Sequence, residues 1–357
     1  MPARTDSRKK IHLEVLRIIA IILVLFHHTE WRGFMLFLYN DGLKSNIYLF
    51  MSIACEIAVP IFFMISGALL LKKDERIKDI LRKRIPRFIL VLFAISAIYY
   101  LYDVWFNQKA WGGFMGILNA FMNNGASGAL WYMYHYIALL LMLPFLRSIV
   151  KNATKQHYLY LIGLNLFLVG ILPMLSFFLT DGKYYFINTF NVVLATTMSF
   201  FFFLMGHFFE NVLQDDFYNT KNCTLLSVAA LAAIIFCILL TNKWIPLRGF
   251  ADSTSNGFHY TLVALPTFAV YAWAKFLFKN ATKTNWATAT VSQFGQCTFG
   301  IYLFERILRE QTMFIFVWLD SFLPTMVSCC LWVLAIVIIG TGFMSVLKLI
   351  PGVKKLI

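Results

Sequence analysis

Long apolar stretches separated by short polar segments make up most of this chain. Each stretch is about as long as the roughly 20 residues that a helix needs to cross a bilayer. We count ten of them: 11–30, 47–71, 87–107, 129–149, 158–179, 190–210, 224–241, 258–279, 294–316 and 325–349. Four charged residues interrupt the ninth stretch, namely Glu305, Arg306, Arg309 and Glu310. The pattern predicts an all-α fold, a polytopic transmembrane helix bundle of about ten helices.

Only short segments separate these stretches. The longest has roughly 20 residues, which is too few for a separate soluble domain of ordinary size, about 50 residues or more. We therefore expect residues 1–357 to form a single membrane domain, in which the helix bundle itself performs any chemistry.

The charged residues indicate how the bundle is oriented. The chain is 60% hydrophobic and 13% charged, with a net charge of +14. Its basic residues gather before the first stretch (Arg4, Arg8, Lys9 and Lys10) and between the second and third (KKDERIKDILRKRIPR, 72–87). Loops rich in Lys and Arg face the cytoplasm. With ten crossings, this distribution predicts cytoplasmic amino and carboxyl termini, and it accounts for the positive charge without a nucleic-acid partner.

Arg17 and His28 are the strongest candidates for chemistry. Both lie in the first stretch, eleven positions apart. Eleven residues make about three helical turns, so the two side chains share one helix face about 16 Å apart. His27 lies about 100° around the helix from Arg17, which makes His28 the better partner. Ionisable groups inside a membrane helix indicate a functional site, although Arg17 alone can be an interfacial anchor and the histidines a polar cap.

Arginine, ten residues and then histidine in a first membrane helix resembles the signature of the integral membrane acyltransferase-3 family, which includes O-acetyltransferases of bacterial surface polysaccharides. Further segments are similar to later elements of that family: VPIFFMISGALLL (59–71), Arg84-Ile-Pro-Arg87, ALWYMYHYIALLLMLPFL (129–146), FLMGHFF (203–209) and FGIYLFERIL (299–308). One position departs, because Glu305 stands where many members have histidine. The resemblance spans nearly the whole chain and implies a multi-pass protein of the bacterial cytoplasmic (inner) membrane.

The resemblance also implies an acyl-CoA donor, and the residues suit one. Transfer of an acyl group from a thioester to a hydroxyl needs a proton acceptor, and imidazole, with an ordinary pKa of about 6.5, suits neutral pH. We therefore expect His28 to be the base and Arg17 to lie between it and the cytoplasmic end. Arg84 and Arg87, with Arg82 nearby, are expected to bind the donor phosphates, because guanidinium groups are planar and always charged. The alternative for this segment is a topological anchor alone.

Three further side chains are assigned to the catalytic machinery and the donor path. Glu56 is expected to orient His28, as a carboxylate does in a catalytic triad, or to pair with an arginine. Ser66 is expected to contact the pantetheine arm of the donor or, equally, to allow tight helix packing. Tyr302, in the late helix, is expected to line the same path.

The remaining candidates belong to acceptor binding. They are His27, Glu30, Trp131, Tyr132 and Glu305. Aromatic faces suit sugar rings, although an aromatic belt is expected at the membrane interface in any case.

Together with these residues, the resemblance implies an enzyme that transfers an acyl group to a hydroxyl of a cell-surface glycan or glycan-lipid. Acetyl-CoA is the first choice of donor and succinyl-CoA stays open, while no residue identifies the glycan. Membrane lipid is the other expected partner, and the cysteines show no spacing that indicates a metal site. The alternative is a membrane transporter or exporter of a polysaccharide or amino acid. Transporters commonly contain repeated halves with matching broken helices, and we find none here.

Overall fold

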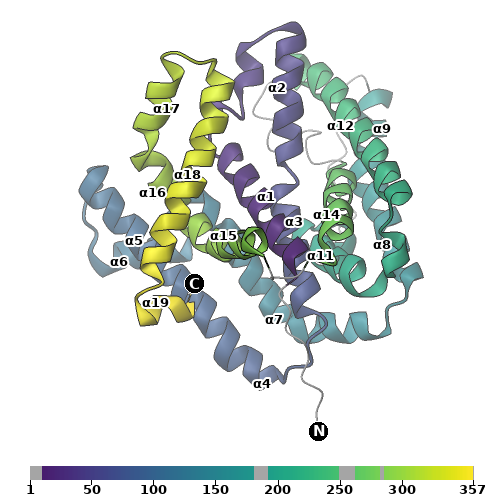
Figure 1. Cartoon of the computed structure of the whole chain (residues 1–357), viewed down its shortest axis with the longest axis horizontal. Helices are drawn as coiled ribbons and strands as arrows, with labels where there is room; N and C mark the ends of the chain where they lie inside the picture. The colour runs from purple at the N-terminus through teal and green to yellow at the C-terminus, as the bar shows by residue number, and fades with distance from the viewer. Residues whose placement is uncertain (1–9, 181–191, 249–261, 282–284, 357) are drawn as a thin grey trace. The chain divides into compact units, whose positions relative to one another are not determined.

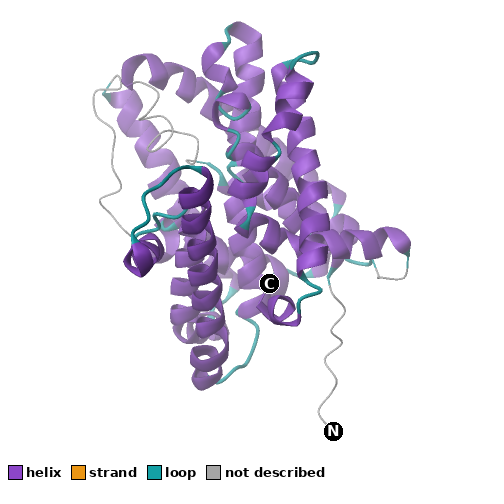
Figure 2. Ribbon diagram, turned by 90° about the vertical axis from the view of Figure 1, so that its left-hand side faces the viewer, coloured by secondary structure: helices purple, strands orange, loops and turns teal. Residues whose placement is uncertain are grey.

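A computed structural model describes residues 10–180, 192–248, 262–281 and 285–356. Every regular element in these ranges is a helix, and Figure 2 shows helices and loops without a strand. The predicted all-α fold is therefore confirmed for the described part of the chain. The predicted cytoplasmic charges Arg4, Arg8 and Lys9 lie outside the described residues.

The chain divides into two compact units, each assembled from separate chain segments. Unit 1 comprises residues 1–69 and 153–298, and unit 2 comprises residues 70–152 and 299–357. That the whole chain acts as one membrane domain stays a prediction.

Unit 1 contains the amino-terminal helix and most of the middle of the chain. Its helices are α1 (Ile11–His27), α2 (Gly42–Cys55), α3 (Ala58–Leu70), α8 (Lys155–Asn165), α9 (Leu172–Leu179), α10 (Val193–Thr196), α11 (Met198–His207), α12 (Thr220–Arg248), α14 (Ala264–Phe278) and most of α15 (Trp286–Leu303). Shorter helical turns are η1 (Glu30–Arg32), η2 (Leu36–Tyr39), η5 (Leu166–Ile171), η6 (Phe208–Val212) and η7 (Asp215–Phe217). Figure 1 shows α12 and α14 side by side, and α14 also packs against α1.

Unit 2 contains the basic segment and the carboxyl-terminal helices. Its elements are α4 (Ile77–Asp79), η3 (Ile80–Arg84), α5 (Ile85–Phe106), α6 (Gly113–Met122), η4 (Gly128–Leu130), α7 (Trp131–Asn152), the end of α15, α16 (Glu305–Gln311), α17 (Met313–Asp320), α18 (Thr325–Leu347) and α19 (Pro351–Leu356). Within this unit α5 packs against α6 and α7, and α17 packs against α18.

Six helical segments among the described residues are long and apolar enough to cross a membrane. They are Gly42–Leu70, Ile77–Phe106, Gly128–Asn152, Lys155–Leu179, Thr220–Pro246 and Thr325–Leu347. These six coincide with six of the ten predicted stretches, as in a multi-pass membrane protein. The described parts of the other four are helical but shorter or interrupted; α1 has 17 residues and α14 has 15. Residues 190–191 and 258–261 of the sixth and eighth predicted stretches lie outside the described residues. The total of ten crossings stays a prediction.

The second predicted stretch is interrupted near its middle. α2 ends at Cys55 and α3 begins at Ala58, so Glu56 and Ile57 lie in a turn. Pro60 follows Glu56 by four positions, and proline has no N–H to donate to the carbonyl four residues earlier. Pro60 therefore accounts for the position of the break. As a result, the buried carboxyl group of Glu56 lies at a helix interruption.

The third predicted stretch begins about ten residues earlier than expected, at Ile77 instead of 87. An ion pair between Lys83 and Asp79, spaced four residues apart with Nζ 2.8 Å from Oδ1, supports the added turns. The π-helical turn η3 ends at Arg84, and Pro86 stands in the first turn of α5, where the missing N–H of proline is tolerated. Arg82 and Arg84 are thus presented by a helix and not by a loop.

Two glycines allow α3 and α11 to touch backbone to backbone. A Cβ added at Gly67 would lie 1.7 Å from the carbonyl oxygen of Phe203, and one at Gly206 would lie 1.8 Å from that of Met64. Neither distance leaves room for any side chain. Close approach of this kind is what small residues permit in membrane helices.

Candidate active site

The sequence-predicted site residues fall into two groups, one in each unit. Unit 1 contains Arg17, His27, His28, Glu30, Glu56 and Ser66, and unit 2 contains Arg82, Arg84, Arg87, Trp131, Tyr132, Tyr302 and Glu305.

The two histidines end α1. His27 is its last residue and His28 is its C-cap, whose backbone N–H still donates to Val24, 3.1 Å away. Their rings meet edge to face with centroids 5.6 Å apart. The buried Thr29 fixes the next turn, since its hydroxyl donates to the carbonyl of Phe26 and accepts from the N–H of Phe34. Both imidazoles are therefore held at the same well-defined helix end, half-buried.

The carboxylate of Glu56 lies beside this pair. Its Oε1 is 3.6 Å from Nδ1 of His27, and its side chain is only 6% exposed. The sequence predicted Glu56 as a partner of His28 or of an arginine; the structure shows its carboxyl group beside Nδ1 of His27, and its role in orienting His28 stays a prediction. Glu56, His27 and His28 thus form one chain of contacts, from the interruption between α2 and α3 to the end of α1.

Arg17 lies towards the other end of α1, with its guanidinium held by the helix itself. Its Nη1 donates to Oε1 of Glu14, 2.9 Å away and three residues earlier. Glu14 is buried, and a Cβ added at Gly295 of α15 would lie 2.3 Å from its Oε2. Gly295 therefore permits α15 to pack closely against Glu14, the partner of Arg17.

Glu30 and Ser66 are placed differently from the histidines. Glu30 is exposed and has a φ of +52°, a backbone conformation rare for residues with a side chain. The hydroxyl of Ser66 donates to the carbonyl of Phe62 in its own helix, 2.8 Å away. Together with the contact at Gly67, this bond favours the packing interpretation of the Ser66–Gly67 pair, and a contact with the donor stays a prediction.

In unit 2, Arg84 binds a carboxylate that was not among the predicted site residues. Its Nε donates to Oε2 of Glu75, 2.9 Å away, and its Nη2 donates to Oε1. Arg147 of α7 donates to the same Oε2, 3.0 Å away. The bonds from Arg84, and then the bond and charge of Arg147, lower the pKa of Glu75 to about 2. This carboxylate is therefore ionised throughout the physiological pH range.

The other two arginines predicted to bind the donor are exposed. Arg87 donates from Nε and Nη2 to the carbonyl oxygen of Leu356, 3.2 and 2.9 Å away. Arg82 is exposed on the same helix. The predicted phosphate-binding set is thus brought to one helical segment, where Arg84 is half-buried and its two neighbours reach solvent.

The aromatic candidates of unit 2 contact one another. The hydroxyl of Tyr302 donates to the carbonyl of Ala129, 2.7 Å away, and its ring meets that of Tyr132 with centroids 5.6 Å apart. Trp131 packs edge to face against His135, with centroids 5.2 Å apart. The start of α7 and the end of α15 are therefore joined at this point.

The helix break after Leu303 is surrounded by polar side chains. Glu305, 2% exposed, begins α16, and Nε of Arg309 lies 3.6 Å from its Oε2. Arg306 donates to both carboxylate oxygens of Asp103 on α5. The charges that interrupt the ninth predicted stretch are thus partnered inside unit 2.

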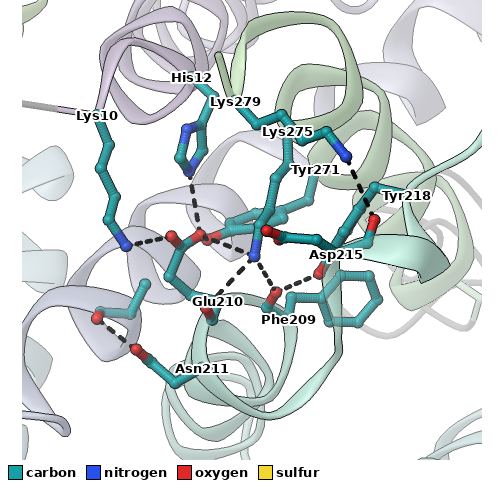
Figure 3. Close-up of polar contacts among 11 residues, drawn as sticks. Lys10, His12, Phe209, Glu210, Asn211, Asp215, Tyr218, Tyr271, Lys275 and Lys279 are labelled. Atoms are coloured by element: carbon teal, nitrogen blue, oxygen red, sulfur yellow. Dashed lines mark hydrogen bonds and ion pairs between the residues drawn. The ribbon is translucent and has the colours of Figure 1, made fainter.

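A buried cluster around Glu210 was not predicted as a site. Its carboxylate accepts hydrogen bonds from Nζ of Lys10, from the hydroxyl of Tyr271 at 2.9 Å, and from Nε2 of His12 at 3.0 Å when that nitrogen is protonated. Lys275 lies 3.8 Å away and also donates to the carbonyl of Phe209 (Figure 3). One carboxylate, 2% exposed, thus joins the amino-terminal end of α1 to η6 and α14.

The sequence signal for this cluster was present but weak. Single ionisable residues, His12, Glu210 and Lys275, stand within or beside predicted membrane stretches, and such residues usually have a partner. Which of them are partners depends on packing between segments about 200 residues apart.

Comparisons with known proteins gave one result. A family model described as an acyltransferase domain matches residues 11–347, from the first residue of α1 to the last of α18. No curated protein and no solved structure matched the chain.

Proposed function

This chain belongs to the acyltransferase-3 family, and from that membership we propose that it transfers an acyl group, acetyl in the first instance, from cytoplasmic acetyl-CoA to a hydroxyl of a cell-surface glycan or glycan-lipid. Succinyl-CoA is the other donor to test. The observation that carries the proposal is the pair of imidazoles at the end of α1, with a buried carboxylate 3.6 Å from the first of them.

His28 is the proposed base. It takes the proton of the acceptor hydroxyl as the hydroxyl oxygen attacks the thioester carbonyl. The carbon–sulfur bond then breaks, and the protonated imidazole returns the proton to the departing CoA thiolate, so that the base is regenerated. Proton transfer of this kind typically accelerates a reaction by about 10²–10⁴-fold.

Glu56 supports this step through His27. A carboxylate beside an imidazole fixes its orientation and stabilises the ring when it is protonated. Because the rings of His27 and His28 are in contact, a fixed His27 ring restricts the orientations open to His28. Glu56 is thus proposed as a positioning residue.

The donor is proposed to bind through its phosphates at the basic helical segment of unit 2. Arg84 and Arg87, with Arg82 beside them, provide planar charged donors for phosphate oxygens. Arg17 is proposed to attract the donor on its way to the base. Ser66 and Tyr302 are proposed contacts of the pantetheine arm.

The acceptor is proposed to bind at the outer face of a bacterial cytoplasmic membrane. His27, Glu30, Trp131, Tyr132 and Glu305 are the residues proposed to contact it. The basic segment would then be cytoplasmic, with both chain ends on that side of about ten crossings.

Purified protein in lipid nanodiscs provides the test. Release of free CoA thiol from acetyl-CoA is measured with and without a hydroxyl acceptor, alongside binding of CoA itself. The proposal expects saturable CoA binding and thiol release that depends on His28. A correctly inserted protein that binds no CoA would favour a transporter.

A further inference from the structure

The contact between Glu75 and Arg84 bears on how the donor is selected. We propose that Glu75 is a specificity-determining residue of the acyl-CoA site. Its carboxylate binds the guanidinium of Arg84, and a phosphate group of the donor must displace it. This inference rests on the proposed function, because it takes acyl-CoA as the ligand.

Glu75 binds Arg84 in the same way that an anionic ligand would. Both oxygens of Glu75 accept from Arg84, one from Nε at 2.9 Å and the other from Nη2. A guanidinium presents the same two-pronged arrangement to carboxylate and to phosphate. A phosphate that binds Arg84 in this way must take the place that the Glu75 carboxylate holds.

Arg147 can keep the carboxylate of Glu75 bound after a phosphate displaces it from Arg84. Its guanidinium is anchored by backbone, with Nε and Nη2 donating to the carbonyl of Leu70 at 3.1 and 2.9 Å, and its side chain is 12% exposed. It also holds Oε2 of Glu75 at 3.0 Å. Glu75 can therefore release Arg84 while it keeps one ion pair, so the exchange leaves no buried charge unpaired.

The charges explain why the exchange discriminates among ligands. Glu75 is ionised at physiological pH because its pKa is about 2. It therefore always competes with a phosphate group for Arg84. A terminal phosphate, with up to about two negative charges, attracts Arg84 more strongly than a single carboxylate does. A singly charged anion gains little binding free energy when it replaces Glu75 at Arg84. A thioester without phosphates gains none.

Asp79 offers a matched control in the same segment. It is a carboxylate four residues away from Glu75, and it pairs with Lys83 at 2.8 Å and with Arg76 at 3.4 Å. Glu75→Gln and Asp79→Asn change the net charge equally, but only Glu75→Gln removes the carboxylate that binds Arg84. A difference between the two variants therefore reports on Arg84 and not on net charge.

The experiment measures dissociation constants for CoA and for acetyl-pantetheine, which lacks phosphates, on the full chain in nanodiscs. Glu75→Gln is expected to bind CoA about tenfold more tightly than wild type, since a charge-assisted competitor is removed. Asp79→Asn should change CoA binding less than about twofold, as expected for an exposed ion pair. Acetyl-pantetheine binding should be unchanged in both variants, and Arg84→Ala should abolish the gain from Glu75→Gln.

Weaker or unchanged CoA binding by Glu75→Gln would overturn the inference, because Glu75 would then position Arg84 instead of competing for it. An equal gain in Asp79→Asn would also overturn it, since the effect would be one of net charge. Glu75→Asp keeps the charge on a shorter side chain, so its affinity for CoA is expected to lie between those of wild type and Glu75→Gln. It replaces Glu75→Gln in the test if that variant does not fold. Wild-type protein that binds no CoA would instead refute the proposed function, and this inference with it.

Discussion

The carboxylate of Glu56 lies 3.6 Å from Nδ1 of His27, where the chain turns between α2 and α3. Glu56 is buried, and the imidazole belongs to a different helix that ends at this point. This contact, next to a second histidine, defines the part of unit 1 on which the proposed chemistry depends.

Replacement of His28 tests the base. His28→Ala is expected to lower acyl transfer by about 10²-fold or more, the usual scale for loss of a general base, while CoA binding persists. His27→Ala removes the ring through which Glu56 is proposed to act, so it should lower transfer about tenfold, well short of the loss at His28. Thiol release in the presence of acceptor measures both. Near-normal transfer by the His28 variant would refute the assignment, and the reverse ranking would move the base to His27.

Replacement of Glu56 tests its positioning role. Glu56→Gln keeps the size of the side chain and removes its charge, so we expect the catalytic rate constant to fall about tenfold, less than for loss of the base itself. The KM for acyl-CoA should stay within about twofold. Asp41→Asn, at an exposed carboxylate before α2, controls for net charge. A change in KM alone would indicate a different role for Glu56.

The Glu210 cluster is expected to stabilise unit 1. Glu210→Gln removes the negative charge that faces Lys10 and Lys275, and breaking a buried ion pair typically costs about 3–5 kcal/mol. Thermal unfolding of the purified protein should therefore shift to markedly lower temperature. Asp216→Asn, an exposed carboxylate nearby, should leave the transition in place. Equal transitions for both variants would mean that the cluster contributes little to stability.

The close contact between α3 and α11 gives a steric prediction. Gly67→Ala would place a Cβ 1.7 Å from the carbonyl oxygen of Phe203, so the helices must separate, at a cost at or above the upper end of the usual range of about 1–3 kcal/mol for overpacking. Gly163→Ala in α8 meets nothing within 4 Å and should be neutral or slightly stabilising, because alanine favours helix. The yield of folded protein on size-exclusion chromatography and its unfolding temperature distinguish the two. Similar behaviour of both variants would contradict the observed packing.

The sequence alone determined the helical class and the positions of six long apolar helices. These properties depend on local composition and on the length of each hydrophobic run. It also placed Arg17 in the first helix and His28 at the end of that helix, because both lie within a single apolar segment. The break at Glu56 could have been found too, since Pro60 stands four residues later.

The partners of the charged residues were decided only by the tertiary structure. Nothing near Glu56 in the sequence indicates His27, and nothing near Arg84 indicates Arg147, 63 positions later in the chain. Glu210 and His12 are separated by 198 residues. Burying a charge is unfavourable unless another group compensates it, so the sequence requires that such partners exist. Their identity follows from which helices pack together, and that is a property of the folded chain.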